Sequence, residues 1–160
     1  IDPAEFSFQY PKSLLLNPHD EDQDNYAHVE LTSATHSGNL IVWVKDTNEK
    51  NMETWAKKEK LTGAIDTTLA GEPAKKELIN PPASRVVSKL IVSTLRKGYL
   101  YQIDVTLDDV EFWNKTFNTV SSTFKFISSE ENIKQKQAPE TSSDQGSTDI
   151  SGSADEEVIE

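Results

Sequence analysis

The residues best suited to chemistry lie in an acidic loop near the start of the chain. The loop reads His-Asp-Glu-Asp-Gln-Asp-Asn over residues 19–25. Its three aspartates stand at alternate positions, Asp20, Asp22 and Asp24. Calcium prefers several carboxylates on a tight turn, so this spacing resembles the start of a calcium-binding loop. The match then stops, because Asn25 replaces the expected Gly and Leu31 the expected Glu. We predict weak Ca²⁺ binding by these aspartates, with a solvated acidic loop as the alternative.

Two histidines and a glutamate form a second candidate set. His28 and Glu30 share the polar face of an expected strand, and His36 lies in the following turn. Imidazole and carboxylate groups are zinc ligands, but this spacing matches no established zinc pattern. We therefore interpret them as exposed strand and turn residues.

The chain carries no recognisable catalytic motif. It has no cysteine, no G-x-S-x-G, no phosphate-binding loop, no dinucleotide fingerprint and no H-E-x-x-H. We predict that the protein is not an enzyme. The alternative from another class is a metal-dependent enzyme that uses the acidic loop.

Charge divides the 160-residue chain into two parts. Residues 1–127 carry 14 Lys/Arg and 18 Asp/Glu, whereas residues 128–160 carry 2 Lys/Arg and 9 Asp/Glu. The net charge of the whole chain is −11. No basic face is available to bind a nucleic acid. The longest apolar run, Leu40–Val44, is far too short to cross a bilayer. We expect a monomer that binds neither nucleic acid nor the membrane interior.

The composition predicts one folded domain. Residues 1–5 are interpreted as vector-derived or linker residues, and residues 6–127 as the domain. Residues 128–160 are rich in Ser, Glu, Asp, Gln and Thr and have no aromatic residue, which predicts a disordered acidic tail.

The pattern along the domain alternates short strands with turns. Strands are expected at 6–10, 13–16, 27–32, 40–44, 65–69, 74–79, 86–95 and 99–107. Asn51 is expected to cap a helix that stops at Gly63, and Asp108 with Glu111 to begin a second helix. Because short turns join most strands, we predict an α+β fold in which helices flank a central antiparallel sheet.

Most aromatic residues are expected to form the core. Apolar residues recur at helical spacing after Asp108, so we expect them on one face of the second helix. They are Val110, Trp113, Phe117, Val120 and Phe124. Tyr101, Trp43 and Trp55 are assigned to the core for the same reason of periodicity. Five lysines form a modest basic area for an acidic partner, or else solvated charge, namely Lys57, Lys58, Lys60, Lys75 and Lys76.

Four features together resemble the PsbP-like superfamily. They are Phe6-Ser7-Phe8-Gln9-Tyr10-Pro11, Gly71-Glu72-Pro73-Ala74, the long hairpin from Arg85, and the final helix and strand with Trp113, Phe117, Val120, Ser122, Phe124 and Phe126. Leu14, Leu15 and Leu16 stand where the family usually has a Trp. The short loops are more similar to the non-photosynthetic bacterial and archaeal relatives than to plant photosystem II subunits. The resemblance implies an α/β/α sandwich.

The same resemblance implies a non-enzymatic protein-binding or assembly domain. We expect it in an extracytoplasmic protein of a cell envelope, periplasm or thylakoid lumen. A lipoprotein cysteine upstream of Ile1 would indicate the envelope. The alternatives are a photosystem II-associated extrinsic or assembly factor, and a small-GTPase-binding adaptor of the same fold.

Overall fold

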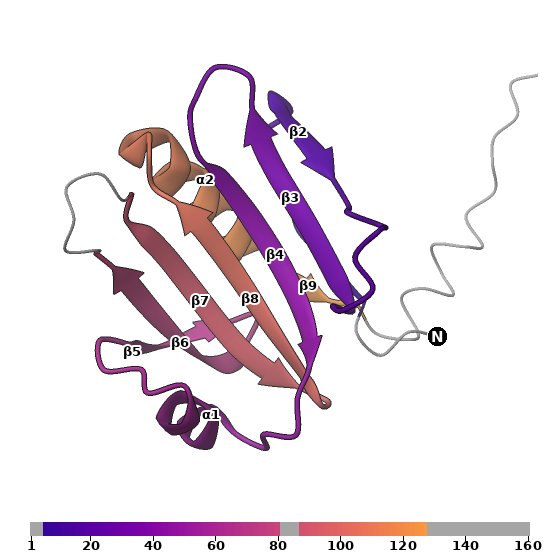
Figure 1. The fold of residues 1–160 in the computed structure, drawn as a ribbon, viewed down its shortest axis with the longest axis vertical. Helices are drawn as coiled ribbons and strands as arrows, with labels where there is room; N and C mark the ends of the chain where they lie inside the picture. The colour runs from indigo at the N-terminus through magenta and orange to yellow at the C-terminus, as the bar shows by residue number, and fades with distance from the viewer. Residues whose placement is uncertain (1–4, 81–86, 128–160) are drawn as a thin grey trace, which may run out of the picture.

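The chain folds around a seven-stranded antiparallel sheet (Figure 1). The computed structural model describes residues 5–80 and 87–127. The strand order is β2-β3-β4-β8-β7-β6-β5. The strands are β2 (Leu14–Asn17), β3 (Ala27–Ser33), β4 (Asn39–Asp46), β5 (Ile65–Leu69), β6 (Glu72–Ile79), β7 (Lys89–Arg96) and β8 (Tyr99–Thr106). The predictions for residues 1–4 and for the tail 128–160 fall outside the described residues.

Period-two alternation in the central strands builds one apolar face. Tyr101, Ile103 and Val105 of β8 are fully buried, and the register pairs them with Val44, Val42 and Leu40 of β4. These six side chains point to one side because successive residues of a strand alternate between its two faces. Burial of this face is the main source of stability, since apolar area removed from water contributes about 25 cal/mol per Å².

The helix α2 (Val110–Thr123) covers this apolar face, behind the sheet in Figure 1. Trp113, Phe117 and Val120 are buried against the strands, as the periodicity predicted. Two details of the prediction are wrong. Asp109 caps the helix in place of Asp108, because its side chain accepts a hydrogen bond from the Phe112 amide. Val110 is 56% exposed and is therefore not part of the buried stripe of the helix.

The helix α1 (Met52–Lys58) lies on the opposite face of the sheet, at one end. Asn51 caps it as predicted, accepting a hydrogen bond from the Thr54 amide. Its residues Met52, Trp55 and Ala56 pack against Leu95 and Leu100. The helix ends at Lys58 and not near Gly63 as predicted. Lys60 supplies the positive φ of +56° that turns the chain out of the helix.

A small second sheet joins the two ends of the described chain. Here β1 (Phe6–Ser7) pairs antiparallel with β9 (Lys125–Phe126). Phe6 stacks on Phe124 with ring centroids 5.4 Å apart, which ties both segments to the α2 side of the core. The Ile127 amide also donates a hydrogen bond to the Glu5 carbonyl at 3.0 Å.

The structure confirms the predicted α+β fold with a large antiparallel sheet. The turn between β5 and β6 uses Ala70 and Gly71, both with positive φ, so that Glu72 and Pro73 already belong to β6. Within the described residues, neither helix has the length and apolar character needed to span a membrane.

Candidate functional site

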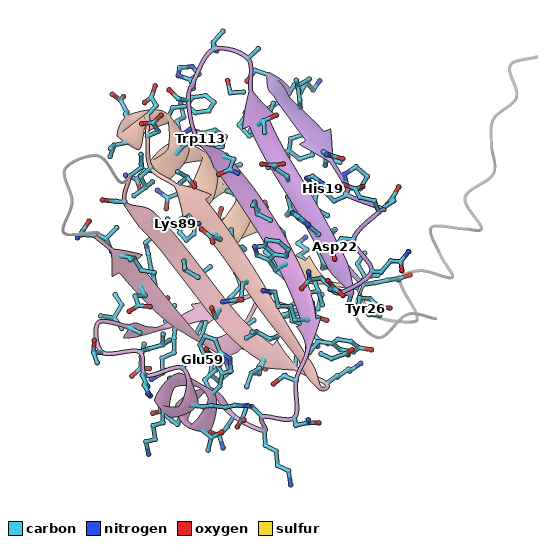
Figure 2. The ribbon with its side chains drawn as sticks, in the orientation of Figure 1. His19, Asp22, Tyr26, Glu59, Lys89 and Trp113 are labelled. Carbon is cyan, nitrogen blue, oxygen red and sulfur yellow. The ribbon has the colours of Figure 1, made fainter. Side chains whose placement is uncertain are left out.

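The sheet face opposite α2 is only partly covered, and we call the uncovered part the open face. The helix α1 covers its lower end, through Leu95 and Leu100. Figure 2 shows Lys89 on this face, turned toward the viewer, and Trp113 with α2 behind the sheet. The side chains of the open face are half-buried, and neither helix in the described part of the chain packs on them. They include Glu30, Ile41, Trp43, Ile91, Gln102 and Asp104.

A column of stacked rings stands at the β3 side of the open face. The imidazole of His28 stacks on Trp43 of the neighbouring strand, with centroids 3.9 Å apart. The His19 ring stacks on His28 from the loop above, at 4.1 Å. The Lys45 ammonium also lies over the Trp43 ring, 4.7 Å from its centroid. Such contacts hold the loop against the sheet and leave an aromatic surface accessible beside it.

Asp22 organises the acidic loop around itself. Its Oδ1 accepts hydrogen bonds from the amides of Asp24 and Asn25, at 3.0 and 3.2 Å. Its Oδ2 accepts a hydrogen bond from the Asn25 side chain at 2.8 Å, and lies 2.9 Å from His28 Nδ1. These bonds lower the pKa of Asp22 to about 2, with the Asn25 side chain as the largest cause. Asp22 is therefore ionised at neutral pH and fixes the shape of the loop.

His19 connects the loop to β3 through two carboxylates. Its Nδ1 lies 2.7 Å from Glu21 Oε1, and its Nε2 lies 2.9 Å from Glu30 Oε2. The hydrogen bonds to Glu30 and Glu21 raise the pKa of His19. The pKa of Glu30 is lowered, first by the hydrogen bond that the Asn39 side chain donates and then by His19. Figure 2 shows His19 and Asp22 side by side at this edge of the sheet.

The structure places the predicted calcium ligands in one loop without joining them into an ion site. Asp22 holds the loop together, as described above, and Asp20 and Asp24 flank it in the chain. Within residues 5–80 and 87–127, no group of three or more His, Asp or Glu side chains is arranged to hold a metal ion. Calcium binding by Asp20, Asp22 and Asp24 stays a prediction.

The histidines considered for zinc separate in the folded chain. His28 pairs with Asp22, whereas His36 Nδ1 lies 2.7 Å from Asp109 at the start of α2. Neither histidine is a plain exposed residue, because each stacks on an aromatic ring, His28 on Trp43 and His36 on Phe112. They therefore tie a loop to the sheet and a turn to a helix.

The predicted basic area does not assemble. Lys75 is only 12% exposed and lies 2.6 Å from both Glu53 and Asp66, so its charge is neutralised between α1 and β5. Lys76 lies over the Phe117 ring at 5.2 Å, on the α2 side of the sheet. Only the lysines at the end of α1 remain together.

Sequence reasoning misassigned Trp43 and missed the open face. Tyr101, Trp113, Phe117 and Trp55 are core residues as predicted, but Trp43 is half-buried and faces away from α2. The run from Leu40 to Val44 hides this because all its residues are apolar. The two-residue period of a strand was the available signal: Leu40, Val42 and Val44 are fully buried on one face, so Trp43 must lie on the other.

Comparison with known proteins identifies the architecture. A scan against protein families finds no match, and a search of curated proteins finds none either. Among solved structures, the chain is similar to cyanobacterial PsbP (CyanoP) from Synechocystis sp. PCC 6803, with 15% identity and a TM-score of 0.52. The similarity covers 76% of this chain and 86% of that chain. The seven-stranded sheet with its two helices is thus a PsbP-like α+β fold.

Proposed function

We propose that this chain is a non-enzymatic protein-binding or assembly domain of an extracytoplasmic PsbP-like protein, and that the open face is its binding surface. One observation carries the proposal: no helix of residues 5–80 and 87–127 lies over the part of the sheet face that has Trp43, Ile41 and Ile91 at its centre. An antiparallel sheet commonly leaves one face in water, and that face is then mostly polar. A tryptophan and two isoleucines on the solvated face are therefore suited to contact with a second protein.

The environment of His19 favours a structural role for this residue over a catalytic one. His19, His28 and His36 each pair with a carboxylate and each stack on another ring. A general base needs a free ring nitrogen directed at a substrate. In His19 both ring nitrogens contact carboxylates, so this imidazole acts as a tie between loop and strand.

Site-specific photo-crosslinking tests the binding role. A photoreactive amino acid replaces Thr32 or Lys89 on the open face, and in a control replaces Lys115, an exposed residue of α2. In the cells that naturally make the protein, we expect Thr32 and Lys89 to crosslink to one and the same protein, and Lys115 not to. Crosslinks spread over many proteins, or equal at all three positions, would contradict the proposal.

The identity of the crosslinked protein separates the alternatives. A photosystem II subunit would favour the extrinsic or assembly factor, and a small GTPase would favour the adaptor. Fractionation tests the proposed compartment, since an extracytoplasmic protein is digested by protease once the outer barrier is opened, while a cytoplasmic marker stays intact. If this protein is protected from the protease together with the cytoplasmic marker, the extracytoplasmic placement is wrong.

A further inference from the structure

One row of side chains across the open face alternates between acidic and apolar residues. The register places Glu30 opposite Ile41, Ile41 opposite Asp104, Asp104 opposite Ile91, and Ile91 opposite Glu77. We call these five residues the acidic–isoleucine row. It crosses β3, β4, β8, β7 and β6 in one line, and all five side chains are partly exposed.

The spacing of the row is fixed by the sheet. Neighbouring strands lie about 4.8 Å apart, so consecutive carboxylates stand about 10 Å apart and the whole row spans about 19 Å. An isoleucine fills each interval. A partner that complements the row needs three cations at this spacing with an apolar side chain between each pair.

An α-helix meets both requirements on one face. Residues i and i+7 lie on the same side and are about 10.5 Å apart, and residues i+3 and i+4 lie between them on that side. An extended strand sends alternate residues to opposite faces, so it cannot repeat a cation every 10 Å on one side. In a polyproline helix the residues between the cations turn away from the sheet, which leaves both isoleucines uncovered.

Two of the three carboxylates, Asp104 and Glu77, have few partners and leave room for such cations, whereas both oxygens of Glu30 already have partners. Among the residues that the structure describes, Asp104 forms one ion pair, with Lys89 at 3.4 Å, and the Lys89 side chain is 47% exposed. Glu30 is held by His19 and Asn39. Glu77 makes no ion pair within the described residues. The described residues therefore neutralise the charge of the row only in part.

The geometry points to a basic amphipathic helix of the partner protein as the occupant of the open face, with Lys or Arg at i, i+7 and i+14 over the three carboxylates and apolar residues over Ile41 and Ile91. This inference rests on the proposed function, because it names the chemistry of the partner at the same surface. Charge complementarity sets the specificity, and the isoleucines supply apolar contact.

Two synthetic helical peptides of equal composition test the inference. The matched peptide carries Lys at positions 1, 8 and 15 with Leu at 4, 5, 11 and 12, in an alanine- and glutamine-rich background. The control peptide keeps every leucine in place and moves two lysines, from positions 8 and 15 to positions 7 and 14, which takes these two cations off the leucine face. Binding is followed by NMR amide shifts of the full chain.

We expect the matched peptide to shift residues of the acidic–isoleucine row and to bind several-fold more tightly than the control. Glu77→Gln and Asp104→Asn should each weaken the binding of the matched peptide about two- to five-fold, the range for exposed ion pairs. Glu111→Gln, on the α2 side, should leave binding unchanged. The affinity should fall with added salt. The amide spectrum of each variant verifies that it remains folded.

Equal binding of both peptides, or shifts outside the row, would overturn the basic-helix inference. A dimer at the open face, detected by sedimentation, would also overturn it in favour of a second copy of this chain. The proposed function fails separately: if crosslinks from Thr32 and Lys89 identify one partner while the matched peptide does not bind, the binding surface stands and only the helix chemistry is wrong.

Discussion

Gly38 lies where the turn after β3 passes over the start of α2. Its φ is +111°, and a Cβ there would come within 2.6 Å of both the Thr106 carbonyl oxygen and Trp113 Nε1. Trp113 Nε1 donates a hydrogen bond to the neighbouring Ser37 carbonyl at 2.7 Å. The turn therefore depends on a residue without a side chain at position 38.

Gly38→Ala should lower the free energy of unfolding by about 3 kcal/mol, through backbone strain and crowding of the buried indole. Gly98→Ala is the matched control. Its φ is +84° but no atom lies within 4 Å of the added Cβ, so we expect a loss of about 1 kcal/mol. Urea denaturation measures both, and equal losses would contradict the role assigned to the close contact.

The pair His36–Asp109 makes the start of α2 sensitive to pH. The hydrogen bond from His36, followed by that from the Phe112 amide, lowers the pKa of Asp109 below its usual 3.8. The folded state thus favours the carboxylate. Its stabilising contribution is present above the unfolded pKa and is lost as pH falls through the lowered folded value.

In His36→Ala the pKa of Asp109 should return toward its usual value, while the Phe112 amide still bonds to the carboxylate. Carboxyl carbon chemical shifts followed by NMR from pH 2 to pH 6 measure the change. An unchanged Asp109 titration in this variant would show that His36 does not stabilise the carboxylate.

Calcium binding in the acidic loop requires a change of partners at Asp22. Both of its oxygens already accept hydrogen bonds, from Asn25 and from nearby amides. We therefore expect amide shifts at Asp20, Asp22 and Asp24 only at millimolar calcium. Asp22→Asn should abolish them. An NMR titration without shifts at millimolar calcium would end the hypothesis.

At the scale of elements, α1 is a short helix that depends on its contacts. It has seven residues, too few to be stable alone, and Trp55 is its largest buried side chain at 6% exposed. Lys75 reinforces the contact through Glu53. The helix should therefore open as a local unit before the sheet unfolds.

Trp55→Ala should detach α1 while β4, β7 and β8 remain paired. We expect faster hydrogen exchange at residues 52–58 and unchanged protection in the central strands. Lys57→Ala, an exposed residue of the same helix, is the control and should alter neither. Equal acceleration in the strands would mean that α1 is part of the global unfolding unit.

The sequence predicted elements well where the signal was local. The strand at residues 65–69 and the cap at Asn51 agree with the structure, because alternation and capping depend on near neighbours. The end of α1 was missed, since Lys60 and not a glycine takes the positive φ. Local rules favour glycine at such a position, so a lysine there gives no signal in the sequence.

The open face could not be predicted from local patterns. The row from Glu30 to Glu77 exists only because β4 pairs with β8, more than fifty residues later in the chain, and β7 joins on the other side. A shift of one residue in either register would bring core residues to this face. Strand order is a property of the whole sheet.

At the scale of the whole molecule, the domain should be independent of the acidic tail. A chain ending at Ile127 loses 9 of the 27 Asp/Glu and 2 of the 16 Lys/Arg. We expect its melting temperature to stay within about 2 °C of the full chain. Ending the chain at Val120 removes Phe124, which is 2% exposed, and should prevent folding. Circular dichroism melting compares the three, and a large drop for the first truncation would contradict the domain boundary.

The pairing of β1 with β9 has a consequence for how the domain joins other polypeptides. Glu5 and Ile127 lie within one backbone hydrogen bond of each other, so both connections leave the fold at a single point. A few residues would suffice to link them, which makes the domain suited to circular permutation or to insertion into a loop of another protein. New termini at the exposed Lys97–Gly98 turn would leave every strand pairing intact.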